Sequence, residues 1–149
     1  MIKKITLSLL CALLGLVFLV SGYTKAGFQL PYSSPIEPFE FTFVDLGFIN
    51  WQIAPFIARL MIGFEFTIGV LLLFNLNLRK LSYKLAIGIL LFFCVYLTLL
   101  ILLVGNKGNC GCFGEVFPMT PFIALMKNVI MLLLFFVLYK HHEGWELPK

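Results

Sequence analysis

Two cysteines separated by one glycine are the residues of this sequence best suited to chemistry. Cys110-Gly111-Cys112 lies in a short polar loop between two long apolar segments. A disulfide between these cysteines would close a very small ring, and departures from the narrow geometry of a disulfide make the bond easier to reduce. Strained, exposed disulfides are typically labile or catalytic. The spacing therefore favours thiol–disulfide exchange, and an inert loop disulfide is the simplest alternative.

A metal site is the other chemistry that a cysteine pair suggests. Structural zinc requires four Cys or His ligands. The two histidines, His141 and His142, follow the last apolar segment, and Cys11 and Cys94 lie inside apolar segments. No zinc site is therefore predicted, although two thiolates would suit Cu(I).

The composition indicates a membrane protein. The 149 residues are 61% hydrophobic and 12% charged, whereas soluble domains have roughly half apolar and about a quarter charged residues. The net charge of +4 comes from cations that fall between apolar runs and form no continuous stripe. Orientation in a bilayer explains such spacing, so the lipid bilayer is an expected partner and nucleic acid is not.

Four apolar segments, at about 5–23, 53–74, 83–104 and 121–139, are each close to the ~20 residues that a spanning helix needs. They show no alternation of period two, so helices are expected rather than a barrel. The first segment is predicted to be a retained span, because its apolar stretch exceeds that of a typical signal peptide. The predicted fold is all-α: an integral membrane four-helix bundle forming a single domain over residues 1–149.

The basic residues predict the orientation of this bundle. One side would carry seven cations, namely Lys3, Lys4, Arg79, Lys80, Lys84, Lys140 and Lys149; the other would carry Lys25 and Lys107 together with four acidic residues. Because Lys and Arg collect on the cytoplasmic side, both termini are expected there. The cysteine loop would then face the oxidising periplasm from the inner membrane of a bacterium.

The connection from Phe28 to Asn50 is the longest in the sequence. It contains three prolines and then aromatic residues mixed with acids, and Pro35 is suited to open a helical turn. Such a composition fits a short element lying in the membrane interface, and it fits equally well an irregular loop held by its aromatic side chains.

Small residues predict how the helices meet, since close approach in lipid relies on them. The first span offers Ser8, Ala12, Gly15 and Gly22. In the second span Ala54, Ala58 and Gly69 share one helical face with Glu65. Glu65 is therefore expected to point into the bundle. A carboxyl at this depth costs ~2.5–3.5 kcal/mol on insertion scales, which makes it a candidate functional group; the alternative is a structural hydrogen bond.

Three cations are predicted to lie at similar depth beneath the cysteine loop. Arg59 and Lys127 each lie about 9 Å in from the outer start of their span, and Lys25 ends the first span. Nearby cations lower the pKa of a thiol. The alternative is snorkelling of each side chain to the headgroups, which is the preferred interpretation for Lys25.

Arg59, Glu65 and Lys127 also form a candidate quinone or proton site, although no motif marks a quinone.

Several of these residues carry a resemblance to a known family. Ser21-Gly-Tyr-Thr-Lys25, Glu65, Cys110-Gly-Cys-Phe-Gly114 and Lys127-Asn128 resemble the DoxX-like membrane proteins, and more closely their MauE (methylamine utilisation) branch. The resemblance implies a four-helix membrane bundle that helps to mature a disulfide-rich periplasmic protein alongside a thioredoxin-like partner. It marks Cys110 and Cys112 as the redox pair and Lys25 and Glu65 as matching positions. DoxX relatives are associated with quinone-linked oxidoreductase complexes.

Three functions follow as hypotheses. The leading one is a membrane thiol–disulfide oxidoreductase or maturation helper that acts through Cys110 and Cys112 on a periplasmic protein, with electrons passing to or from a quinone. The second is a non-catalytic accessory subunit that anchors a respiratory complex, with the cysteines as a loop staple. The third is a small-solute transporter with Glu65 as its proton site, which the lack of an internal repeat disfavours.

Overall fold

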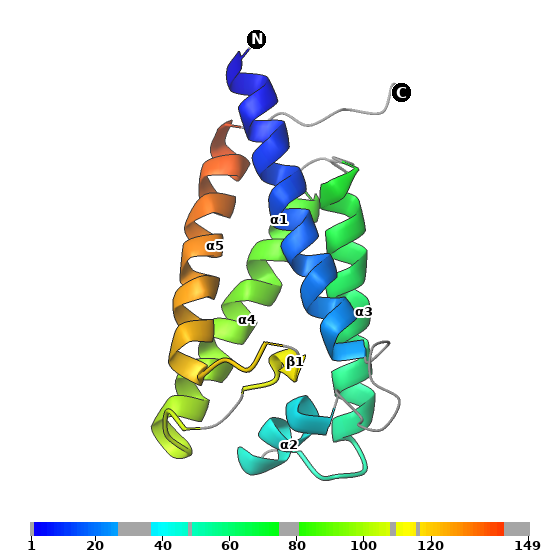
Figure 1. Ribbon diagram of the computed structural model, residues 1–149, viewed down its shortest axis with the longest axis vertical. Helices are drawn as coiled ribbons and strands as arrows, with labels where there is room; N and C mark the ends of the chain where they lie inside the picture. Colours follow the sequence, from blue (N-terminus) through cyan, green and yellow to red (C-terminus); the bar gives the residue numbers. More distant parts are fainter. Residues whose placement is uncertain are drawn as a thin grey trace.

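The computed structural model describes residues 2–26, 37–47, 49–74, 81–107, 110–115 and 117–141. The elements, in chain order, are α1 (Ile2–Ala26), α2 (Glu37–Asp45), α3 (Ala54–Leu73), α4 (Leu81–Leu103), the short strand β1 (Cys112–Glu115) and α5 (Pro121–His141). The four long helices run side by side. The start of α1 and the end of α5 lie at one end of the bundle, and α2 and β1 lie at the other (Figure 1).

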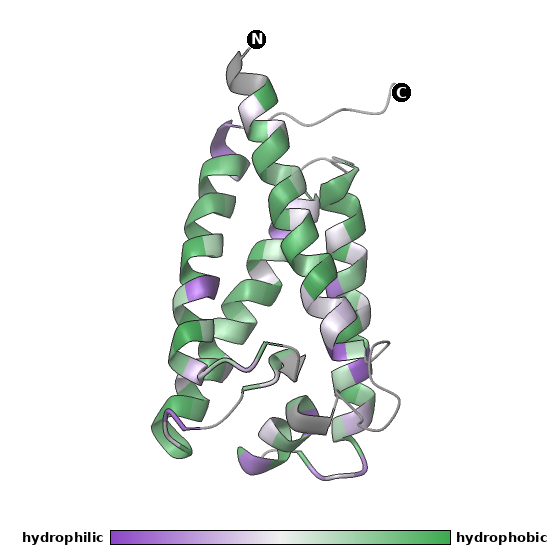
Figure 2. Ribbon diagram, viewed as in Figure 1, coloured by the Kyte–Doolittle hydropathy of each residue, from purple (hydrophilic) through white to green (hydrophobic). Residues whose placement is uncertain are grey.

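The long helices confirm the predicted spans. Each is long and apolar enough to cross a membrane, and no boundary differs from the prediction by more than three residues. Hydrophobic residues cover most of their length, with few hydrophilic positions between (Figure 2). Large apolar side chains such as Phe56 and Leu102 face outward, as they do in a bundle surrounded by lipid tails. The fold is therefore an all-helical multi-pass membrane bundle.

Glycines allow α1 and α3 to approach closely. A Cβ atom on Gly15 would lie 2.9 Å from the carbonyl oxygen of Gly69, and one on Gly69 would lie 3.1 Å from the carbonyl oxygen of Gly15. Ala54, Ala58 and Glu65 are buried together with Gly69 on α3. The predicted small-residue face is thus confirmed, and with it the inward position of Glu65.

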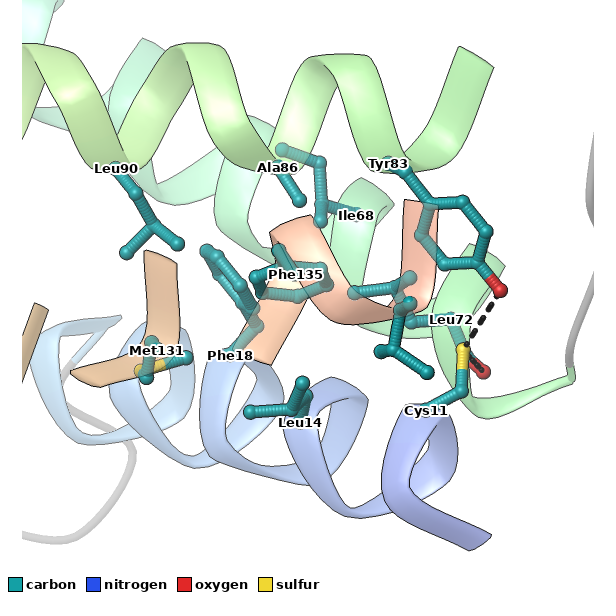
Figure 3. Packing of buried hydrophobic residues seen from close by; sticks show 11 residues of the cluster. Cys11, Leu14, Phe18, Ile68, Leu72, Tyr83, Ala86, Leu90, Met131 and Phe135 are labelled. Atoms are coloured by element: carbon teal, nitrogen blue, oxygen red, sulfur yellow. Dashed lines mark hydrogen bonds between the residues drawn. The ribbon is translucent and has the colours of Figure 1, made fainter. Parts of the chain in front are cut away.

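The half of the bundle nearer the start of α1 is an apolar core (Figure 3). Phe18 of α1 packs against Phe135 of α5 with ring centroids 6.1 Å apart, and Leu90 of α4 belongs to the same cluster. At its edge the Cys11 thiol lies 3.5 Å from the Tyr83 hydroxyl. Cys11 thus behaves as a buried side chain of the core, far along α1 from the cysteine loop.

The other end of the bundle is closed by α2. Of the two interpretations of residues 28–50, the helical element is correct for Glu37–Asp45, whereas Pro35 lies outside the described residues. Phe39 and Phe43 are buried with ring centroids 4.9 Å apart, and the Phe43 ring lies 4.9 Å from that of Tyr96 on α4. This aromatic packing attaches α2 to the bundle directly beside the cysteine loop.

Candidate functional site

The cysteine loop is tightly packed. The backbone N–H of Cys110 donates to the carbonyl of Met119 at 3.0 Å, and Gly111 takes a φ of 68°, a conformation that costs other residues free energy. A Cβ atom on Gly111 would lie 2.9 Å from the backbone of Phe39. Glycine is thus required both for the turn and for the close approach of α2.

Both thiols are free and buried beneath this contact. Cys110 is 0% exposed and Cys112 is 4% exposed, so the pair lacks the exposure that is typical of labile disulfides. The physical reason is α2, which covers the loop with Phe39. A partner that reacts with either sulfur has to move this cover or approach from the cavity beneath it.

The two thiols have different acidities. A hydrogen bond from the Cys112 thiol lowers the pKa of Cys110 to about 7, against an opposing effect of burial and with further help from the charges of Lys127 and Lys25. The pKa of Cys112 is raised well above its ordinary value, first by that same hydrogen bond and then by burial. The thiolate is the nucleophilic form of cysteine. Of the two thiols, Cys110 is therefore the one that ionises more readily near neutral pH.

A buried ion pair lies below the loop. Lys25 Nζ of α1 is 2.6 Å from Glu65 Oε1 of α3, and both side chains are almost fully buried. The ammonium also lies 4.9 Å from the centre of the Phe39 ring and 5.0 Å from that of Phe93. Snorkelling of Lys25, the preferred interpretation from the sequence, is therefore wrong: a carboxylate and two aromatic faces hold its charge inside the bundle.

Ser21 joins this ion pair to the cysteine loop. Its hydroxyl lies 3.0 Å from the carbonyl oxygen of Cys112 and 3.4 Å from Glu65 Oε2. A serine hydroxyl has only one hydrogen to donate, and the shorter distance assigns that hydrogen to Cys112. Sequence reasoning gave Ser21 no such role. The available signal was its spacing of four residues from Lys25, which places both side chains on one face of α1.

Lys127 approaches the same region from α5. Its Nζ lies 4.2 Å from the centre of the ring of Phe113, the residue that follows Cys112, and its neighbour Asn128 is buried. Lys127 therefore lies beside the cysteine loop, as its depth in the span predicted, because its ammonium contacts the residue that follows Cys112.

Arg59 does not join this cluster. Its side chain is 65% exposed, and its guanidinium lies 3.6 Å from Glu40 Oε1 of α2. Of the two interpretations left open for Arg59, the structure therefore favours a side chain that points out of the bundle over one that joins Lys25 and Lys127 beneath the cysteine loop. Arg59 follows Ala58, which is fully buried, and successive helical positions point in directions about 100° apart. Depth along a helix is thus a poor guide to which face a residue occupies.

A small cavity lies at the centre of this cluster. It is lined by apolar residues of α1, α4 and α5 and by the polar groups of Ser21, Lys25, Glu65, Cys112, Lys127 and Asn128. Its volume of about 20 Å³ is enough for about one water molecule. Arg59 is not among the lining residues, so the structure brings Glu65 and Lys127 together at this cavity without Arg59.

The comparisons with known proteins agree with the motifs of the sequence. The family model described as "Methylamine utilisation protein MauE" matches residues 3–140. Protein TlpB of Flavobacterium psychrophilum is 40% identical over 137 residues, an alignment that covers 88% of this chain and 36% of TlpB. The chain therefore spans little more than a third of the length of that relative. No solved structure matches. Since the family model covers nearly the whole sequence, this membrane protein belongs to the MauE family.

Proposed function

We propose that this protein is a thiol–disulfide exchange protein of the bacterial inner membrane that acts on a periplasmic protein. The observation that carries the proposal is the pair of adjacent, chemically different thiols. Cys110 has a pKa lowered to about 7, and Cys112, two residues away, retains its proton. Catalytic dithiols combine an attacking thiolate with a second thiol that resolves the mixed disulfide. A cysteine pair whose only role is to fix a loop needs no such difference.

The reaction is a two-step exchange. The Cys110 thiolate attacks a disulfide of the partner, forms a mixed disulfide and releases one partner thiolate. Cys112 then loses its proton and attacks Cys110, which forms the Cys110–Cys112 disulfide and releases the partner as a dithiol. Two electrons pass to the partner and the protons on its thiols come from the medium. The reverse sequence oxidises a partner dithiol.

The orientation in the membrane supports a periplasmic partner. The cysteine loop and α2 occupy the end of the bundle opposite the start of α1 (Figure 1). Lys84 and Lys140 are exposed near the start of α4 and the end of α5, at the end that the distribution of basic residues assigns to the cytoplasm. The family resemblance favours a partner that is thioredoxin-like or is itself matured by disulfide formation, and kinship with the DoxX-like proteins belongs to the same proposal.

The test is capture of the partner. In Cys112→Ser the resolving thiol is absent, so we expect a mixed disulfide between Cys110 and a periplasmic protein, visible on a non-reducing gel and lost on reduction. Cys110→Ser is the matched control and should trap far less. Equal trapping by both variants, or none by either, would contradict the assignment of Cys110 as the attacking thiol.

The burial of both cysteines favours a second candidate function. In an accessory subunit the pair would only fix the loop against α2, and the fully covered position of Cys110 is compatible with that role. The double Cys110→Ser, Cys112→Ser variant separates the two functions. An accessory subunit would retain its activity in this variant, and an exchange protein would lose it.

A further inference from the structure

The charges around the cavity do not balance when the thiols are left out. The described side chains that line the cavity include two ammonium groups, Lys25 and Lys127, and one carboxylate, Glu65. Glu65 already neutralises Lys25 at 2.6 Å. The lining residues that α4 contributes, Leu90 and Phe93, are apolar. One positive charge therefore remains, and it belongs to Lys127.

Lys127 has no carboxylate within ion-pair distance in the part of the chain that the structure describes. Its ammonium rests on the ring of Phe113, next to Cys112. Burying a charge is costly unless an opposite charge lies close to it. The thiol pair can provide that charge, because the Cys110 thiolate lies within the electrostatic reach of Lys127 and Lys25. In the reduced protein the two ammonium groups, the carboxylate and the thiolate sum to zero.

Disulfide formation removes this compensating anion. Once the Cys110 sulfur is bonded to that of Cys112 it carries no charge, whereas Lys25 and Glu65 still neutralise each other. A charged Lys127, half-buried at the cavity, would then lack a neighbouring anion. Losing its proton restores neutrality, and this state is accessible to lysine because an ammonium group, unlike a guanidinium, can change its protonation state.

We infer that Lys127 is a redox-linked proton-exchange group, which carries an ammonium charge while Cys110 and Cys112 are reduced and releases its proton when they form a disulfide. The inference rests on the proposed function, in which the pair cycles between these two states. Per disulfide formed, two electrons leave the cysteine sulfurs for the disulfide of the oxidant. One proton leaves Cys112 and one leaves Lys127, and the oxidant takes up two protons as it becomes a dithiol. Reduction reverses each transfer.

The experiment is a redox titration of the full chain in detergent against reduced and oxidised dithiothreitol at several pH values above the pKa of Cys110. With Cys110 already a thiolate, the cysteines alone would release one proton on oxidation. Because Lys127 adds a second, wild-type protein releases as many protons as oxidised dithiothreitol takes up, so at a fixed ratio of reduced to oxidised dithiothreitol, and below the thiol pKa of dithiothreitol, its ratio of disulfide to dithiol should not change with pH. In Lys127→Arg, whose guanidinium cannot lose its proton, that ratio should fall about tenfold per pH unit. Lys140→Arg, at the other end of α5, is the matched control and should behave as wild type.

A second variant keeps the inference testable if arginine disturbs the fold. Lys127→Met removes the charge, so the Cys110 thiolate should form only at higher pH, which its ultraviolet absorbance reports. A wild-type shift of tenfold per pH unit, or an unchanged onset of the thiolate in Lys127→Met, would overturn the role of Lys127 and leave the exchange function intact. Failure of the pair to form any disulfide would overturn both.

Discussion

The two cysteines show how strongly the surroundings of a residue decide its chemistry. Cys110 and Cys112 are identical side chains two positions apart, and both are buried. One accepts a hydrogen bond and lies in the field of two lysines, so its thiolate is stabilised. The other donates that hydrogen bond and remains a thiol. The sequence predicts the pair and the nearby cations, but it does not predict which thiol is the more acidic, because that depends on the fold of a three-residue turn.

The acidity of Cys110 gives a pH dependence. The thiolate reacts with alkylating reagents and the thiol does not, so a lowered pKa moves the onset of reactivity to lower pH. Alkylation of Cys110 by a small reagent, followed by mass spectrometry, should reach half of its maximal rate near pH 7. In Cys112→Ala the midpoint should rise toward the ~8.5 of an ordinary cysteine. An unchanged midpoint in that variant would show that Cys112 does not stabilise the thiolate.

The ion pair predicts a pattern of stability. Glu65→Gln leaves the Lys25 ammonium buried without its anion, so we expect a loss of about 3–5 kcal/mol in the free energy of unfolding. The double variant Lys25→Met, Glu65→Leu should lose less free energy of unfolding than Lys25→Met and Glu65→Leu lose in sum, because no unpaired charge then remains in the bundle. Unfolding in mixed micelles measures Glu65→Gln, Lys25→Met, Glu65→Leu and the double variant. Strict additivity would mean that the two residues do not interact as the structure shows.

Residue-level prediction succeeded for Glu65, missed the role of Ser21 and left two interpretations open for Arg59. A carboxyl within a spanning helix is costly in contact with lipid and therefore faces the bundle interior. The small residues on the same helical face indicated that side, and Glu65 is buried there. Ser21 is an ordinary residue for a spanning helix, and only the position of the Cys112 carbonyl gives it a partner. Arg59 has the depth that was expected but lies on the outer face, where Glu40 of α2 is within reach.

At the scale of elements, α2 is the feature with the greatest consequence for function. It places Phe39 over the Cys110-Gly111-Cys112 turn and encloses both sulfurs. Direct attack by Cys110 on a protein partner would require α2 to move, since Cys110 has no exposed surface, whereas Cys112 also borders the cavity beneath the loop. The spanning helices were predictable because apolar length alone defines them. The sequence left α2 undecided, because its aromatic residues fit a helix on the bundle and a loop at the interface equally well.

The contact between α2 and the turn can be tested at Gly111. Gly111→Ala puts a Cβ atom 2.9 Å from the backbone of Phe39 at a positive φ, which costs about 1–2 kcal/mol for the backbone conformation alone. We expect that loss of stability together with faster alkylation of Cys110, because α2 has to move away. Gly88→Ala, which meets nothing within 4 Å, is the matched control and should change neither. Slower or unchanged alkylation in Gly111→Ala would show that α2 does not cover the thiol.

At the scale of the whole molecule, the bundle has a chemically asymmetric arrangement. The buried ion pair, the cavity and the thiols lie near α2 and β1, and the apolar core extends from Phe18 and Phe135 toward Cys11 at the other end (Figure 3). The groups suited to exchange chemistry are thus confined to one end of the bundle. The number of spans and their boundaries followed from the sequence. The sequence did not predict that α1, α3, α5 and the cysteine loop meet at one cavity, because helix packing decides which helical faces meet.

The orientation can be tested with reporters at the two ends of α4. Lys107 and Lys84 are both exposed, Lys107 beyond the end of α4 and Lys84 near its start. In intact cells, Lys107→Cys should react with a membrane-impermeant thiol reagent, and Lys84→Cys should react only after lysis. These reporters are preferable to the native cysteines, which are buried. The opposite labelling pattern would place the thiol pair in the cytoplasm and contradict a periplasmic partner.

The most direct test of the central claim is the reduction potential of the Cys110–Cys112 pair, measured on the purified protein against a thiol redox buffer. A small disulfide ring is strained, and the Lys127 and Lys25 charges favour the thiolate, so both effects favour the reduced state and raise the potential. We expect a reversible disulfide with a potential above about −230 mV, in the range of catalytic oxidoreductases. A potential below about −300 mV, typical of structural disulfides, would contradict the account and identify the pair as a loop staple.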